Sequence, residues 1–171
     1  FMTLALTLFY LGYVNAGHRR RFFLSGYAAI GFAVLAKGPV GIVIPVTIVG
    51  LFLLLKKRLN FIKELQLGWG ILILFGVAAP WYIFIGIEDP EFFRFFFIEQ
   101  NFGSFFARDV RHPEPFYFYI PVLMGAMFPW SPVLPLAIFR GIQSGAASSN
   151  DGTWFVLIWF AAIFVFFSLA S

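Results

Sequence analysis

Residues 22–55, FFLSGYAAIGFAVLAKGPVGIVIPVTIVGLFLLL, decide the fold that we expect. This run of 34 residues is predominantly apolar, and its one charged interruption is Lys37-Gly38-Pro39. As a single helix it would be about 50 Å long, at about 1.5 Å per residue, whereas the hydrocarbon core of a bilayer is about 30 Å thick. We therefore expect two short antiparallel spans that are joined by a tight turn at residues 37–39.

The composition of the whole chain is that of an integral membrane protein. Of its 171 residues, 61% are hydrophobic and only 12% are charged, whereas about 25% of the residues in a soluble domain are charged. The net charge is +4, but the basic residues occur in short clusters between apolar runs, so we expect no nucleic-acid partner. The chain has no cysteine, which excludes disulfides and thiolate metal sites within it.

The apolar runs on either side of the hairpin complete an all-α, polytopic transmembrane bundle of about six spans. The span at residues 116–139 is entered through aromatic residues and contains several prolines, so we expect it to be kinked. Both ends of the chain fall inside apolar runs, so we interpret residues 1–171 as a single transmembrane domain that is an internal piece of a longer protein. Besides the hairpin, the expected segments are spans at residues 1–14, 67–87, 116–139 and 153–169, with a Gly/Ser-rich connector at residues 140–152.

Lysine and arginine are distributed unequally between the two ends of these spans. One end collects eight of them and the other end four, and an excess of Lys and Arg marks the cytoplasmic side. We therefore expect the turn at residues 37–39 and a loop at residues 87–115 to face the opposite side. The eight are Arg19, Arg20, Arg21, Lys56, Lys57, Arg58, Lys63 and Arg140, and the four are Lys37, Arg94, Arg108 and Arg111.

Residues 86–121, GIEDPEFFRFFFIEQNFGSFFARDVRHPEPFYFYIP, gather acidic, basic and aromatic side chains beside the membrane. Such a mixture suits a site that holds an anionic lipid headgroup and a sugar. The alternative is an interfacial loop whose aromatic side chains merely sit at headgroup level. Asp89-Pro90-Glu91 is typical of a helix start, and it predicts a short interfacial helix from Pro90 to about Glu99.

Three basic residues are candidates for binding a lipid phosphate. Lys37 is expected at the external turn, where its charge and the turn's backbone amides suit a phosphate; the alternative is an ordinary charged residue at a helical turn. Arg94 either binds lipid phosphate or makes a local ion pair. Arg108 forms a basic patch with Arg111 and His112 that anionic headgroups would favour, although basic residues beside a membrane are common without a site.

Glu99 and His112 are the candidates that we consider for a metal. Glu99 ends the aromatic helix, where it would orient a substrate, bind a metal or cap the helix end. His112 with Glu99 and Glu114 gives a loose set of nitrogen and oxygen ligands without compact ligand spacing. We therefore assign no cofactor, and a divalent metal stays open as an alternative.

Several short motifs, taken in order, are similar to those of a known family. They are Lys37-Gly38-Pro39 in the apolar hairpin, Pro80-Trp81-Tyr82 before the external loop, Glu99 after the Phe-rich helix, His112 followed by PFYFYIP at residues 115–121, and Pro129-Trp130. Across nearly the whole chain they resemble the bacterial polyprenyl-phosphate-dependent glycosyltransferases, whose relatives include the lipid A aminoarabinose transferase and the protein O-mannosyltransferases.

This resemblance implies the multi-spanning GT-C fold and the transfer of a sugar from a polyprenyl-phosphate donor to a lipid or protein acceptor. The reaction would take place at the periplasmic face of the bacterial inner membrane, with membrane lipids around the enzyme. The resemblance also places Lys37, Arg94 and Glu99 on motif positions that line the external cavity, and His112, Tyr117 and Tyr119 at its rim. Arg108 and Arg111 are added to these candidates from the basic patch. The candidate donor-phosphate ligands are Lys37, Arg94 and Arg108, and the candidate cavity-lining residues are Glu99, Arg111, His112, Tyr117 and Tyr119.

Two departures from the family pattern bear on the site. The chain has Glu99-Gln100 where close relatives carry Glu-His, which argues against a bound metal. It has Ser104-Phe105 where they often carry Arg-Phe, a role that Arg108 would have to fill. The family's catalytic acid lies in an external loop upstream of Phe1, so we expect the chain to hold part of an active site without the presumed base.

Two other classes of function stay open. A segment of a membrane transporter would also contain broken spans and an intramembrane lysine, but its ionisable sites are expected at mid-membrane in paired repeats, whereas here they lie near the surfaces. A non-catalytic membrane subunit would use the central loop to bind a partner.

Overall fold

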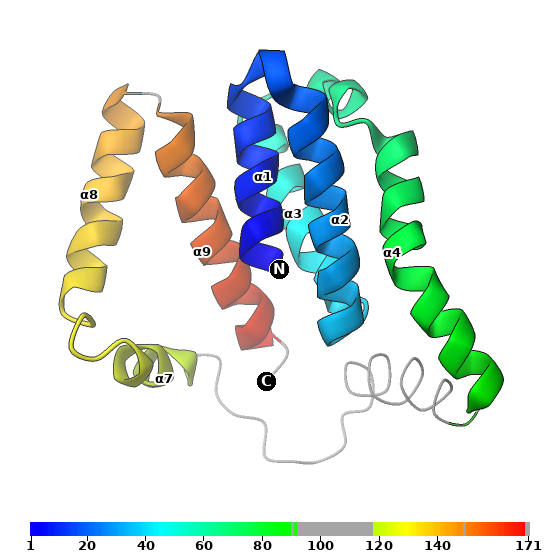
Figure 1. The fold of residues 1–171 in the computed structure, drawn as a ribbon. Coiled ribbons are helices and arrows are strands. Elements are labelled where there is room, and N and C mark those ends of the chain that lie inside the picture. The colour runs from blue at the N-terminus through cyan, green and yellow to red at the C-terminus, as the bar shows by residue number, and fades with distance from the viewer. Residues whose placement is uncertain (90, 92–117, 149, 170–171) are drawn as a thin grey trace. The chain divides into compact units, whose positions relative to one another are not determined.

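The computed structural model describes residues 1–89, 91, 118–148 and 150–169, and the regular elements among them are helices (Figure 1). This confirms the all-α prediction. By its internal contacts the chain divides into two compact units, Phe1–Asp109 and Val110–Ser171, which we describe separately. The elements are α1 (Met2–Val14), η1 (Ala16–His18), α2 (Arg19–Lys37), α3 (Val40–Leu55), η2 (Leu59–Glu64), α4 (Leu67–Glu88), α7 (Tyr119–Ala126), α8 (Val133–Ser148) and α9 (Asp151–Leu169), where η marks a 3-10 helix.

Two of the described helices have both the length and the apolar character of membrane spans. Within the described residues, Leu67–Glu88 and Asp151–Ser168 are long and apolar enough to cross a bilayer. Shorter apolar helices are Met2–Val14, Val40–Leu55 and Val133–Gln143.

The predicted hairpin in residues 22–55 is confirmed. Helix α2 ends at Lys37, and α3 begins at Val40 after Gly38 and Pro39. Gly38 has φ 73°, a backbone conformation that residues with a Cβ rarely adopt, and Pro39 has no N–H to continue the α2 hydrogen-bond ladder. The chain therefore reverses within two residues.

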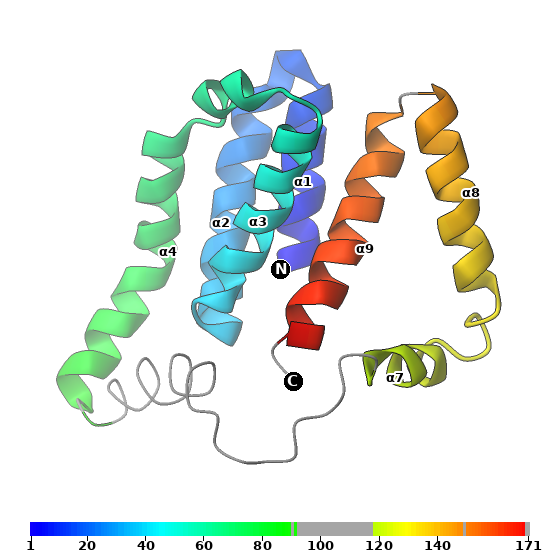
Figure 2. The same cartoon turned by 180° about the vertical axis from the view of Figure 1, so that it is seen from behind.

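The core of the first unit is made by α1, α2 and α3. Figure 2 shows α3 lying against one side of the α1–α2 pair. The ring of Phe9 stacks on Phe23 with centroids 5.7 Å apart and meets Tyr27 edge-on at 5.1 Å. The largest fully buried side chains are Phe23, Phe52, Leu6, Ile30, Ile48, Leu53 and Pro45.

The two basic clusters of the first unit lie at the same end of its helices, as predicted, and the Lys37 turn lies at the other end (Figure 1). Arg19 forms an ion pair with Glu64 of η2, and its guanidinium carbon lies 4.8 Å from the centroid of the Phe61 ring. Arg58 donates a hydrogen bond of 2.8 Å to the Tyr13 hydroxyl. These contacts fasten η2 to the α1–α2 connection.

The second unit corrects the prediction of one kinked span at residues 116–139. Helix α7 ends at Ala126, residues 127–132 form turns, and α8 begins at Val133. The reason is that Pro129 and Pro132 remove two nearby backbone donors, which a helix interior does not tolerate. Pro121 and Pro135, by contrast, lie in the first turns of α7 and α8, where the N–H has no intrahelical partner.

The predicted connector at residues 140–152 is also wrong. Helix α8 continues to Ser148, and α9 begins at Asp151 rather than at residue 153. The Asn150 side-chain oxygen accepts a hydrogen bond of 3.0 Å from the Gly152 amide, which is the cap of α9. Alanine and glutamine sustain a helix through a stretch whose glycines and serines suggested a loop.

Within this unit α8 and α9 run antiparallel, and α7 lies across the pair rather than along it (Figure 1). Of the predicted loop at residues 87–115, only residues 87–89 and 91 belong to the described part. The helix predicted from Pro90 to about Glu99 therefore lies outside the described residues.

Candidate functional site

The Lys37 turn is the part of the predicted site that the structure describes. Lys37 is the last residue of α2 and is exposed, at the end of the helix where a positive charge is favoured by the helix dipole. Its side chain makes no hydrogen bond or ion pair with any residue that the structure describes. Its ammonium group is thus free, with respect to those residues, to receive an anion.

The backbone amides of this turn are largely used by the turn itself. The Gly38 amide donates to the Val34 carbonyl at 2.7 Å, Gly41 to Gly38 at 2.9 Å, and Ile42 to Pro39 at 2.9 Å. The expectation that these amides join Lys37 in holding a phosphate is therefore not supported for Gly38, Gly41 and Ile42. The site's positive charge at this turn comes from the Lys37 side chain.

Helix α4 supports the turn from the side. It runs in the same direction as α2, as two close approaches show. A Cβ on Gly70 would meet the Tyr27 ring, and farther along both helices a Cβ on Gly31 would meet Val77 at 2.8 Å. Near the end of α2, the hydroxyl of Tyr82 donates a hydrogen bond of 2.9 Å to the Val34 carbonyl. This contact joins the Pro80-Trp81-Tyr82 motif to the Lys37-Gly38-Pro39 motif.

Sequence reasoning missed this contact. It identified both motifs separately, 43 residues apart (80 minus 37), but assigned no role to Tyr82. A single hydroxyl near the end of an apolar span was the available signal, since a hydroxyl within a membrane span seeks a hydrogen-bond partner.

The side chains of the other predicted site residues lie outside the described part of the structure. Those outside the described residues are Arg94, Glu99, Arg108, Arg111, His112 and Tyr117, and Tyr119 is the first residue of α7 with a side chain outside the description. Within residues 1–89, 91, 118–148 and 150–169, no group of three or more His, Cys, Asp or Glu side chains is placed to hold a metal. The two metal candidates, Glu99 and His112, lie outside that range.

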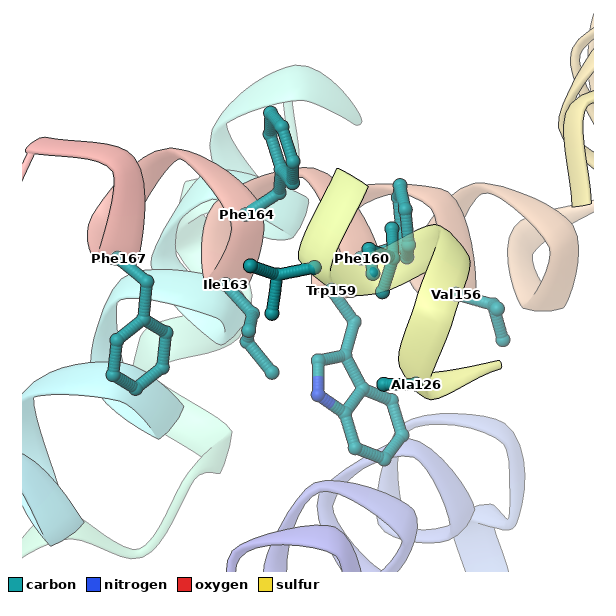
Figure 3. Close-up of a pocket in the computed structure, with 9 residues that line it drawn as sticks. Ala126, Val156, Trp159, Phe160, Ile163, Phe164 and Phe167 are labelled. Carbon is teal, nitrogen blue, oxygen red and sulfur yellow. The ribbon is translucent and has the colours of Figure 1, made fainter. Parts of the chain in front are cut away.

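The second unit contains an apolar pocket of about 570 Å³ between α7 and α9 (Figure 3). Figure 3 shows Trp159 and Ile163 of α9 extending toward it. Among the described residues no ionisable side chain lines it, so the described part of this pocket supplies no acid, base or phosphate ligand. Its lining residues are Val122, Leu123, Ala126, Val156, Trp159, Phe160, Ile163, Phe164 and Phe167.

Comparison with known proteins gives consistent relatives over nearly the whole chain. Two curated relatives are the undecaprenyl phosphate-alpha-4-amino-4-deoxy-L-arabinose arabinosyl transferase of Erwinia tasmaniensis, 31% identical over 174 residues, and its second form in Pseudomonas fluorescens, 30% identical over 169 residues. The alignments cover 98% and 96% of this chain, but only 30% and 28% of those proteins. The chain thus spans less than a third of the length of the curated relatives it matches.

Solved structures show the same fold. The crystal structure of ArnT from Cupriavidus metallidurans bound to undecaprenyl phosphate matches with a TM-score of 0.84 and 26% identity, over 98% of this chain and 30% of that one. The apo structure of the same protein matches with a TM-score of 0.80. The expected GT-C fold, a polytopic helical membrane bundle, is confirmed.

The family assignment rests on the amino-terminal half of the chain. The model of the family "Dolichyl-phosphate-mannose-protein mannosyltransferase" matches residues 1–96, which contain both the Lys37 turn and the Pro80-Trp81-Tyr82 motif. That match covers more than half of the chain and agrees with the resemblance drawn from the motifs. The chain belongs to the dolichyl-phosphate-mannose-protein mannosyltransferase family of glycosyltransferases.

Proposed function

We propose that the full-length protein is a membrane glycosyltransferase that transfers a sugar from a polyprenyl-phosphate donor to a lipid or protein acceptor. The observation that carries this proposal is the match of 98% of the chain to a structure bound to undecaprenyl phosphate. The names of the curated relatives favour 4-amino-4-deoxy-L-arabinose as the sugar and undecaprenyl phosphate as its carrier. Lipid A is the acceptor that we propose to test first.

We assign Lys37 to the donor phosphate. In the transfer, the bond between the anomeric carbon of the sugar and the phosphate oxygen breaks, and the acceptor hydroxyl oxygen bonds to that carbon. The departing polyprenyl phosphate gains negative charge, which a nearby ammonium group stabilises. The acceptor proton passes to a base that we place outside this chain.

The remaining site assignments extend this proposal along the external loop. Arg94 and Arg108 are proposed as further ligands of the donor phosphate. The proposed cavity-lining residues are Glu99, Arg111, His112, Tyr117 and Tyr119.

Sugar transfer by the full-length protein tests the function. Purified protein in proteoliposomes is given undecaprenyl phosphate carrying radiolabelled 4-amino-4-deoxy-arabinose and lipid A, and the expected result is labelled lipid A. Movement of the labelled donor across the bilayer without transfer would instead identify a transporter. If a correctly folded protein shows no transfer and no movement of the donor, that result would favour a non-catalytic subunit.

We also propose that the Lys37 turn faces the periplasm and η2 faces the cytoplasm. Helix α4, with 22 residues, is about 33 Å long at about 1.5 Å per residue, which is long enough for its two ends to lie on opposite sides of the membrane. In a full-length protein otherwise free of cysteine, an impermeant thiol reagent applied to spheroplasts should label Glu88→Cys at once. It should label Asn60→Cys, in η2, only after permeabilisation; the reverse pattern would contradict this topology.

A further inference from the structure

Tyr82 lies where α4 meets the end of α2. The Val34 carbonyl oxygen accepts two hydrogen bonds, one from the Tyr82 hydroxyl at 2.9 Å and one from the Gly38 amide at 2.7 Å. Val34 is buried at 7% exposure, and Tyr82 is half-buried. The bond is therefore a part-buried contact between α2 and α4.

The position of the bond gives it influence over Lys37. The last carbonyls of a helix lack partners within the helix, and Pro39 has no N–H to donate to them. The Val34 carbonyl is bonded by the Gly38 amide that follows α2, and the Tyr82 hydroxyl adds the bond that reaches it from α4. Lys37 follows Val34 by three residues, within that same last turn. A hydrogen bond that holds the Val34 carbonyl against α4 thus fixes the end of α2 from which the Lys37 side chain extends.

Two other close approaches between α2 and α4 lie farther from the turn. The contact between Gly70 and Tyr27 and that between Gly31 and Val77 are apolar and precede Tyr82 along α4. Beyond Tyr82, α4 continues to Glu88 and leads into the segment that contains Arg94 and Arg108. In the sequence, Tyr82 thus precedes the segment that contains the other candidate phosphate ligands.

We propose that Tyr82 is a positioning residue for the donor-phosphate site, which it serves by holding the Lys37 turn through the Val34 carbonyl. It touches neither sugar nor phosphate in this account. The inference rests on the proposed function, because it takes Lys37 as a ligand of the donor phosphate. It assigns to the Pro80-Trp81-Tyr82 motif a role that the motif's place in the sequence does not reveal.

The test is a double-mutant cycle in the full-length protein with undecaprenyl phosphate as the probe. Tyr82→Phe keeps the ring and removes the hydroxyl, and we expect it to weaken binding of the probe about three- to tenfold, the range of an interhelical hydrogen bond in a membrane. In a Lys37→Met background the same substitution should change binding less than about twofold, because residues that act through one another are not additive. In turnover, Tyr82→Phe should lower kcat/KM for the donor, and Lys37→Met should largely abolish this effect.

Tyr13→Phe is the matched control. The Tyr13 hydroxyl also takes part in a hydrogen bond between elements, accepting from Arg58 at 2.8 Å, but at the opposite end of the unit. We expect both tyrosine variants to lose a similar, small amount of thermal stability, and only Tyr82→Phe to weaken probe binding. Equal losses of binding in the two tyrosine variants would show a merely structural effect and overturn the proposal.

Additivity would overturn it as well. If Tyr82→Phe weakens binding by the same factor with Lys37 and with Met at position 37, then Tyr82 does not act through Lys37. The outcome for Tyr82 is separable from the outcome for the function: absence of sugar transfer by the wild-type protein contradicts the proposed function, whereas additivity contradicts the role of Tyr82 alone.

Discussion

Replacing Lys37 by methionine in the full-length protein is expected to weaken donor binding about ten- to hundredfold, the range of about 1.5 to 3 kcal/mol for a hydrogen bond to a charged group. Methionine keeps most of the aliphatic stem and removes the charge. The free energy of unfolding should hardly change, because the side chain is exposed and makes no hydrogen bond or ion pair with the described residues. Initial rates over a range of donor concentrations measure the effect as a rise in KM, together with a fall in kcat because Lys37 also stabilises the departing phosphate.

Lys37→Arg is the conservative comparison for this prediction. It keeps the positive charge but changes the shape of the donor group, so the loss should be smaller than with methionine. Identical kinetics for the wild type and Lys37→Met would remove Lys37 from the phosphate site.

Gly41→Ala should destabilise the hairpin that presents Lys37. A Cβ at Gly41 would lie 2.7 Å from both the Ala33 carbonyl carbon and the Val34 nitrogen, and backbone atoms cannot move aside as a flexible side chain can. We expect the free energy of unfolding to fall by about 1 to 3 kcal/mol, as for other overpacked positions. This change in the free energy of unfolding is measured by unfolding the full-length protein with sodium dodecyl sulfate and monitoring the loss of helix by circular dichroism.

Gly50→Ala is the control in the same helix. A Cβ at Gly50 meets no atom within 4 Å among the described residues, and alanine is a better helix former than glycine. This variant should be as stable as the wild type or slightly more stable. Equal destabilisation by the two substitutions would mean that α2 and α3 do not approach each other at Gly41.

The hairpin and the grouping of charges could be predicted from the sequence because each follows from a local pattern. The length of residues 22–55 required two helices, and Lys37-Gly38-Pro39 supplied a glycine for the positive φ and a proline that stops the ladder. The basic clusters at Arg19 and Arg58 were placed at one end by alternating span direction, and the ion pair of Arg19 with Glu64 agrees.

The break between α7 and α8 could not be predicted in the way that the hairpin could. The sequence shows where prolines occur, but it does not show whether neighbouring helices satisfy the carbonyls that the prolines leave without a donor. Pro121 and Pro135 fall in first turns and are tolerated, whereas Pro129 and Pro132 end the regular structure. Asn150, which caps α9, was a local signal for the start of that helix. The glycines and serines of the surrounding stretch favoured a connector instead.

For the site, the sequence identified Lys37 and the motif around Tyr82, but it did not identify the contact between them. That contact is a property of packing: it depends on α2 and α4 running in the same direction and approaching at Gly31 and Gly70. Motif spacing along the chain carries no information on such a distance. The assignments in residues 92–117 stay predictions from resemblance.

Equilibrium binding of undecaprenyl phosphate to the full-length protein in nanodiscs tests the central claim, that the Lys37 turn belongs to the donor site, most directly. The comparison uses the wild type, Lys37→Met, and Lys63→Met, which removes an exposed lysine from η2 at the opposite end of the unit. We predict that the wild type and Lys63→Met bind with the same affinity and that Lys37→Met binds about ten- to hundredfold more weakly. Equal affinity of all three proteins, or a loss in Lys63→Met that matches the loss in Lys37→Met, would contradict it.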